Sequence, residues 1–73
     1  MSLIPRITRN MLQIFDSTNG SIKRTMNLPS NADFSGPIVT GDLVTVSIQY
    51  KSGKNKSRTY NIKTGALVRE IDM

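Results

Sequence analysis

Residues Leu43–Tyr50, with the sequence LVTVSIQY, decide the fold of this chain. Val44, Val46 and Ile48 alternate with polar residues, and Tyr50 continues the same apolar set. Successive side chains of a β-strand point to opposite sides, so a period of two marks a strand with one buried face. β-branched residues, which favour strands, supply most of the apolar positions. The segment predicts a half-buried strand.

Polar, glycine-containing turns lie on both sides of this strand and recur along the chain. They occupy positions 17–20, 40–42, 51–56 and 63–65, and the first contains Asn19-Gly20, a strong hairpin signal. Six strands are expected between them, at 11–15, 21–26, 37–39, 43–50, 58–62 and 66–71. No window has the apolar spacing of a capped helix. The sequence therefore predicts an all-β fold of antiparallel hairpins, arranged as a propeller-like blade, a small barrel or a sandwich.

We expect residues 1–73 to form a single small β domain with three parts. Residues 10–27 are an N-terminal hairpin or half-repeat, residues 28–36 are a linker, and residues 37–72 are a four-stranded, blade-like unit. Pro29 and Pro37 bound the linker, and proline has no N–H for the hydrogen-bond ladder of a central strand.

A degenerate repeat relates two of the predicted hairpins. Segment 14–26 aligns with segment 59–71, so that Gly65 follows Gly20 by 45 positions and Arg69 follows Arg24 by the same interval. The chemically similar pairs are Phe15/Tyr60, Asp16/Asn61, Ser21/Ala66, Ile22/Leu67 and Met26/Ile71. A period of 40–50 residues built from short strands is typical of four-stranded propeller blades.

These segments resemble a known family. Residues 60–71, YNIKTGALVREI, are similar to the corner between the third and fourth strands of a β-propeller repeat of the quinoprotein or WD-related kind. Segments 36–39 and 41–46 resemble the first two strands of that repeat. The resemblance covers about one and a half blades and implies a blade-like fold. It carries over no cofactor site, because the chain has no Trp to match the docking Trp of quinoprotein repeats.

The length of the chain creates a packing problem. A closed propeller has about four to eight blades, more than this chain can supply. Several chains can build a ring, the strands can close into a small barrel or sandwich, or the sequence can be a piece of a longer protein. A chain of this size buries only about 60% of its unfolded surface, which favours self-association.

The charge of the chain is unevenly distributed. Ten Lys and Arg against five Asp and Glu give a net charge of +5, and no acidic residue lies between Asp42 and Glu70. The candidate polyanion contacts in this segment are Lys51, Lys54, Lys56, Arg58 and Lys63. They can bind a nucleic acid or an acidic protein partner, or simply keep a hairpin loop solvated.

Arg24 and Arg69 occupy matched positions among apolar residues, and we predict for both a packing or interface role. A long Arg side chain can lay its stem over a core and present its guanidinium to a neighbouring chain.

Composition excludes several classes of function. Without Cys or His there is no disulfide framework, no usual zinc site and no Ser-His-Asp triad. Glu70 and Asp72 share one strand face, and we interpret them as a solvated strand end. We therefore expect no catalytic, metal or cofactor-binding residues. No apolar run reaches the roughly 20 residues of a membrane helix, and the N-terminus lacks the core of a signal peptide, so a cytoplasmic or virion location is expected.

The resulting hypothesis is a non-enzymatic structural or assembly protein that acts as a homo-oligomer, for example as a component of a phage or another multi-copy particle. Two alternatives remain open. One is a nucleic-acid-binding module that uses the basic hairpin 51–63, and the other is a ligand- or sugar-binding oligomeric ring.

Overall fold

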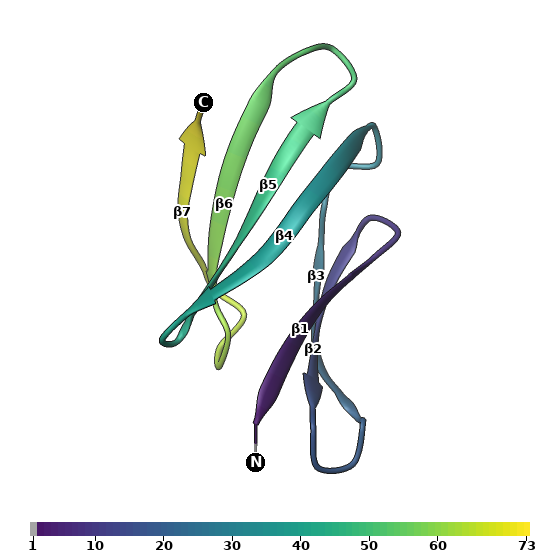
Figure 1. Ribbon diagram of the computed structural model, residues 1–73, viewed down its shortest axis with the longest axis vertical. Helices are drawn as coiled ribbons and strands as arrows, with labels where there is room; N and C mark the ends of the chain where they lie inside the picture. The colour runs from purple at the N-terminus through teal and green to yellow at the C-terminus, as the bar shows by residue number, and fades with distance from the viewer. Residues whose placement is uncertain (1) are drawn as a thin grey trace.

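The computed structural model describes residues 2–73, which form two antiparallel sheets (Figure 1). The N-terminal sheet contains β1 (Leu3–Thr8), β2 (Met11–Asp16) and β3 (Ile22–Asn27). The C-terminal sheet contains β4 (Ala32–Thr40), β5 (Leu43–Tyr50), β6 (Asn55–Asn61) and β7 (Leu67–Asp72). Strand order follows the sequence in both sheets, so each sheet is a meander. The all-β prediction is confirmed. No helix in the described part of the chain could cross a membrane.

The structure has seven strands, one more than the six that the sequence predicts. Strand β1 was missed because Pro5 interrupts its apolar pattern. It pairs only with β2, and the edge of a sheet tolerates proline. The predicted linker 28–36 is also too long, since β4 begins at Ala32. Strand β4 is likewise an edge strand, and its register shifts between Ser35 and Ile38, where Pro37 lies.

The core lies between the two sheets. Its five completely buried side chains come from the central strands β2 and β5; they are Leu12, Ile14, Val44, Val46 and Ile48. The alternation that marked residues 43–50 as a half-buried strand is thus confirmed. Each such aliphatic side chain contributes about 1.5–3 kcal/mol through burial. The sheets come closest along β1 and β4.

The two turns related by the repeat have the same geometry. Asp16 and Asn61 accept hydrogen bonds through their backbone carbonyls from the N–H groups of Gly20 and Gly65, at 2.8 Å in both turns. Their side-chain Oδ1 atoms accept a second bond from the N–H two residues later, at 2.8 and 2.9 Å. The glycine φ angles are 73° and 78°. The repeat seen in the sequence is therefore a repeat of backbone conformation.

The likeness extends over three strands of each sheet. The register of β2 and β3 shifts between Ile14 and Phe15, and that of β6 and β7 shifts at the matching point, between Thr59 and Tyr60. Strands β1 and β5 pair with β2 and β6 in the same register. The meander β1–β2–β3 is thus equivalent to β5–β6–β7, and β4 is an additional strand.

Candidate self-association surfaces

Each sheet has two faces, which we name after one residue. In the N-terminal sheet, the Arg24 face also bears Leu12 and Ile14, and the opposite side is the Phe15 face. In the C-terminal sheet, the Tyr60 face also bears the apolar residues of β5, and the opposite side is the Arg69 face. The Arg24 face packs on the Tyr60 face to make the core. The other two faces point away from it.

A row of apolar side chains crosses the Phe15 face. Ile4 pairs with Phe15, and Phe15 pairs with Ile22, so the three side chains lie side by side on β1, β2 and β3. Ile4 is 50% exposed and Ile22 is 52% exposed. The guanidinium of Arg6 lies 5.4 Å from the centre of the Phe15 ring. We call Ile4, Phe15 and Ile22 the open row.

The C-terminal sheet carries the equivalent row on its Tyr60 face. Val44 pairs with Tyr60, and Tyr60 pairs with Leu67. Here the N-terminal sheet covers the row, so that Val44 is 0% and Tyr60 5% exposed, while Leu67 at the sheet edge remains half exposed. The same backbone unit therefore occurs once with two of its three row residues covered and once with the row open to a larger extent.

Arg24 connects the two sheets within the chain. Its Nε donates a hydrogen bond to the backbone carbonyl of Lys63 at 2.8 Å. Its Cδ lies 3.0 Å from the point where a Cβ on Gly65 would be. The side chain of Arg24 thus lies across the β6–β7 turn and links it to β3.

Arg69 is exposed on the Arg69 face. The turn equivalent to the one that Arg24 covers contains Gly20, and outside the neighbouring residues no atom of residues 2–73 lies within 4 Å of a Cβ placed there. Arg24 therefore contacts the β6–β7 turn, whereas the equivalent residue Arg69 makes no such contact with the β2–β3 turn of the same chain.

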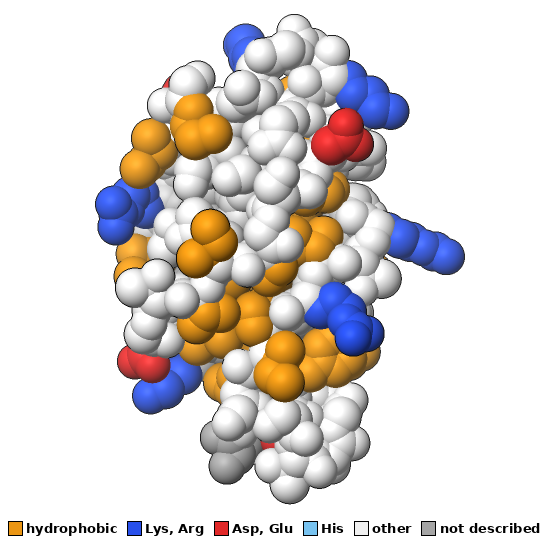
Figure 2. Space-filling view, viewed as in Figure 1, with side chains coloured by type: hydrophobic (Ala, Val, Ile, Leu, Met, Phe, Trp, Pro, Cys, Tyr) orange, Lys and Arg blue, Asp and Glu red, His pale blue; other side chains and the backbone are white. Residues whose placement is uncertain are grey.

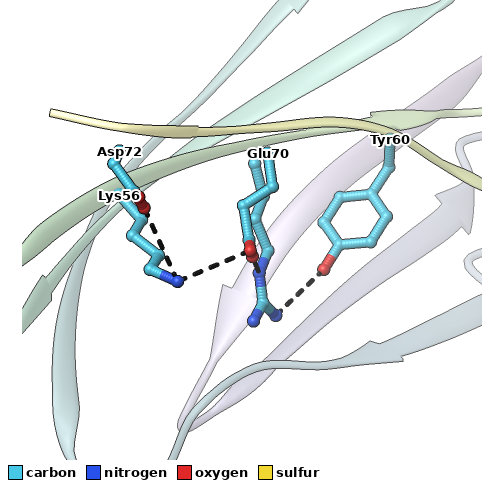
Figure 3. Close-up of polar contacts among 5 residues, drawn as sticks. Lys56, Tyr60, Glu70 and Asp72 are labelled. Atoms are coloured by element: carbon cyan, nitrogen blue, oxygen red, sulfur yellow. Dashed lines mark hydrogen bonds and ion pairs between the residues drawn. The ribbon is translucent and has the colours of Figure 1, made fainter.

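Lys56 and Arg58 face two carboxylates on the next strand (Figure 3). The Lys56 Nζ lies 3.6 Å from a carboxylate oxygen of Glu70 and 3.6 Å from one of Asp72. Arg58 Nε donates a hydrogen bond to Glu70, and an Arg58 terminal nitrogen lies 3.5 Å from the Tyr60 hydroxyl. Glu70 and Asp72 do share a strand face, and both are used in ion pairs.

The ion pairs and hydrogen bonds shift the pKa values of Lys56, Arg58 and Glu70. The carboxylates of Glu70 and Asp72 raise the pKa of Lys56. The hydrogen bond from Arg58 lowers the pKa of Glu70, although desolvation opposes this shift. Burial opposes the charged form of Arg58, but the hydrogen bonds to Glu70 and Tyr60 outweigh it and raise the pKa of the guanidinium. These three shifts all favour the charged forms of Lys56, Arg58 and Glu70.

The five predicted polyanion contacts are distributed over both ends of the C-terminal sheet. Lys51 and Lys54 are exposed in the β5–β6 turn, at one end of the C-terminal sheet. Lys63 is in the β6–β7 turn at the other end, where its Nζ lies 3.6 Å from Asp42. Lys56 and Arg58 form ion pairs with the carboxylates of Glu70 and Asp72 on β7. In the sequence, these carboxylates come only after the β6–β7 turn. The acid-free segment of sequence is therefore not an acid-free surface.

A groove of about 690 Å³ opens between the sheets beside the β6–β7 turn. Lys23, Arg24, Asp42 and Lys63 contribute its charged lining. Over residues 2–73, no three His, Cys, Asp or Glu side chains are grouped as metal ligands would be.

Sequence reasoning identified Arg24 and Arg69 but not the open row. Ile4 was missed together with strand β1. Ile22 was visible in the repeat alignment, where it matches Leu67, but the alignment does not tell which face of a ribbon is covered. No family model, curated protein or solved structure significantly matches this chain.

Proposed function

We propose that this protein is a non-enzymatic structural subunit that acts as a homo-oligomer, in which copies cover one another's open sheet faces. One observation carries the proposal: two of the three row positions, Val44 and Tyr60, are buried in the C-terminal sheet, whereas in the N-terminal sheet Ile4 is half exposed and Phe15 is only partly covered. A contiguous exposed apolar strip costs solubility and is typical of an interaction site, whereas scattered apolar residues are ordinary.

Further apolar surface supports the proposal. Apolar side chains reach the surface in the middle of the molecule, whereas Lys and Arg lie mostly toward its outline (Figure 2). Besides Ile4 and Ile22, the large apolar residues at least 46% exposed are Ile38, Val39, Leu67, Val68, Ile71 and Met73. Such a subunit suits a particle built from many identical copies, and a phage virion is one such particle.

Light scattering on the protein tests this function. We expect a mass that is a multiple of the 8.1 kDa chain. The double variant Ile4→Ser, Ile22→Ser should fall to the mass of one chain with an unchanged β-type circular dichroism spectrum, because both side chains are half exposed and contribute little to the fold of a single chain.

Val39→Ser provides the matched control. Val39 is 47% exposed, close to the exposure of Ile4, but it lines the groove between the sheets of one chain. This variant should keep the oligomer mass. A wild-type mass of one chain at all concentrations would refute the proposed function.

A further inference from the structure

We propose that the copies join head to tail, by repeating between chains the sheet contact that each chain makes within itself. This inference rests on the proposed homo-oligomer and specifies its interface. The partner is a second copy, whose Arg69 face covers the Phe15 face of the first. The following steps derive this contact from the repeat.

Both halves of the internal contact have an uncovered counterpart. Within the chain, the Arg24 face of one unit packs on the Tyr60 face of the next. The interval of 45 residues carries Arg24 onto Arg69 and Phe15 onto Tyr60. In backbone position the Arg69 face therefore corresponds to the covering surface, with Ser57 and Thr59 in place of Leu12 and Ile14, and the Phe15 face corresponds to the covered one. Two chains placed in the same relation as the two sheets bring them together.

The hydrogen bond of Arg24 within the chain predicts an equivalent hydrogen bond between chains. Arg24 Nε bonds the carbonyl of Lys63, and position 63 corresponds to position 18. In the proposed contact, Arg69 of one copy donates to the Thr18 carbonyl of the next. No described residue occupies the space above Gly20, so the stem of Arg69 can lie there as the stem of Arg24 lies on Gly65.

The surrounding side chains fit burial. Met26, whose Sδ lies 3.6 Å from the Gly65 Cβ position, is matched by Ile71, which is 46% exposed. The hydroxyls of Thr45 and Thr59 on the Arg69 face are 3.0 Å apart and hydrogen-bonded to each other. Their mutual bond lets them enter an interface without losing a partner. Thr59 stands where the other unit has Ile14, so the contact between chains is more polar than the core.

The proposed contact uses two different surfaces and is therefore heterologous. Each copy offers one Arg69 face and one Phe15 face, and every added copy leaves one of each free. Such a contact continues until it closes into a ring, or it grows as a filament. It differs from a two-fold dimer, in which one surface meets itself.

Cross-linking of single-cysteine chains tests the contact, because the native chain has no Cys. Lys23 and Lys63 line one groove within the chain, and their counterparts are Val68 and Thr18, which are both exposed. Val68→Cys and Thr18→Cys chains are mixed in urea, refolded together and treated with a short bismaleimide. The mixture should give a cross-linked pair, and each chain alone should give none.

The double variant Thr18→Cys, Val68→Cys should give a ladder of three or more linked chains. Efficient linking of either single variant to itself would show a two-fold contact and overturn the inference. An oligomer mass without cross-links in the mixture would also overturn it, and would leave the homo-oligomer standing. A mass of one chain would remove both proposals together.

A pair of substitutions provides an independent readout. Arg69→Ala should weaken association about ten-fold or more, the effect of losing a hydrogen bond to a charged group, and leave the fold of the single chain unchanged. Arg24→Ala is the matched control, since it removes the equivalent bond inside the chain and should lower the thermal stability of the single chain. Wild-type association of the Arg69→Ala protein would contradict the proposed contact.

Discussion

At Glu70, one carboxylate on β7 meets two cations of β6, Lys56 and Arg58. In the sequence these cations belong to a long acid-free segment, and their charges appear free. In the folded chain Lys56 and Arg58 form ion pairs with carboxylates of β7. Of the lysines near this hairpin, Lys51 and Lys54 remain exposed at the turn. Surface ion pairs are individually weak, but a shared network holds the strand end in register.

The Glu70 network predicts a pH dependence of stability. The pKa of Glu70 is lower in the folded chain than the ordinary value of 4.5. The unfolded chain therefore binds the proton more readily, so the contribution is full above pH 4.5 and is lost as the pH falls through the lowered pKa. Urea denaturation from pH 7 down to pH 3 should show a smaller loss of stability for Glu70→Gln than for the wild type. Parallel curves for the two proteins would contradict the role of this carboxylate.

Substitutions at the equivalent glycines Gly20 and Gly65 distinguish the cost of backbone strain from the cost of crowding against Arg24. Gly20→Ala and Gly65→Ala each force alanine into the left-handed region, at a cost of about 1–2 kcal/mol. At Gly65 the added Cβ also approaches Arg24 Cδ at 3.0 Å and disturbs its bond to Lys63, which adds about 1 kcal/mol. Measured on the dissociated chain, the free energy of unfolding should fall further for Gly65→Ala. Equal losses would show that Arg24 does not hold this turn.

At the scale of the element, β5 is an interior strand of the C-terminal sheet and contributes three of the five completely buried side chains. It pairs with β4 on one side and β6 on the other, and its alternate residues fill the core. The strand was predictable because its period-two pattern is entirely local. By contrast, β1 and β4 are edge strands: Pro5 interrupts the pattern of β1, and the unpredicted first half of β4 lies between Pro29 and Pro37. The pairing of both depends on partners elsewhere in the chain.

Substitutions of two isoleucines measure how much a buried and an exposed side chain of the C-terminal sheet contribute to stability. Ile48 on β5 is completely buried, and Ile48→Ala should lower the free energy of unfolding by about 2–5 kcal/mol by opening a cavity. Ile38 on β4 is 64% exposed, and Ile38→Ala should change it by less than about 0.5 kcal/mol. Urea denaturation of both proteins provides the comparison. A large loss for Ile38→Ala in the single chain would contradict the described packing.

At the scale of the whole molecule, the two sheets bury one face each and leave one face each outside. Residues 2–73 form two sheets and no third sheet that could cover the remaining faces. In the proposed assembly, a second copy of the chain covers them.

Assembly should make thermal stability depend on concentration. A folded state that self-associates is stabilised by mass action, so the melting temperature of the wild type should rise with protein concentration. The Ile4→Ser, Ile22→Ser protein should melt at one temperature across the same series. Differential scanning calorimetry over a hundred-fold range of concentration makes the measurement. A wild-type melting temperature that does not change would argue against the oligomer.

The sequence by itself determined the fold class, the strand at residues 43–50, the glycine turns and the equivalence of the two hairpins. These features follow from local backbone preferences and from the alternation of side chains along one segment. Only the tertiary structure decided which face of each ribbon is covered, and that β7 neutralises Lys56 and Arg58. Both depend on contacts between segments far apart in the chain, and the repeated pattern, being alike in its two copies, does not distinguish a covered face from an open one.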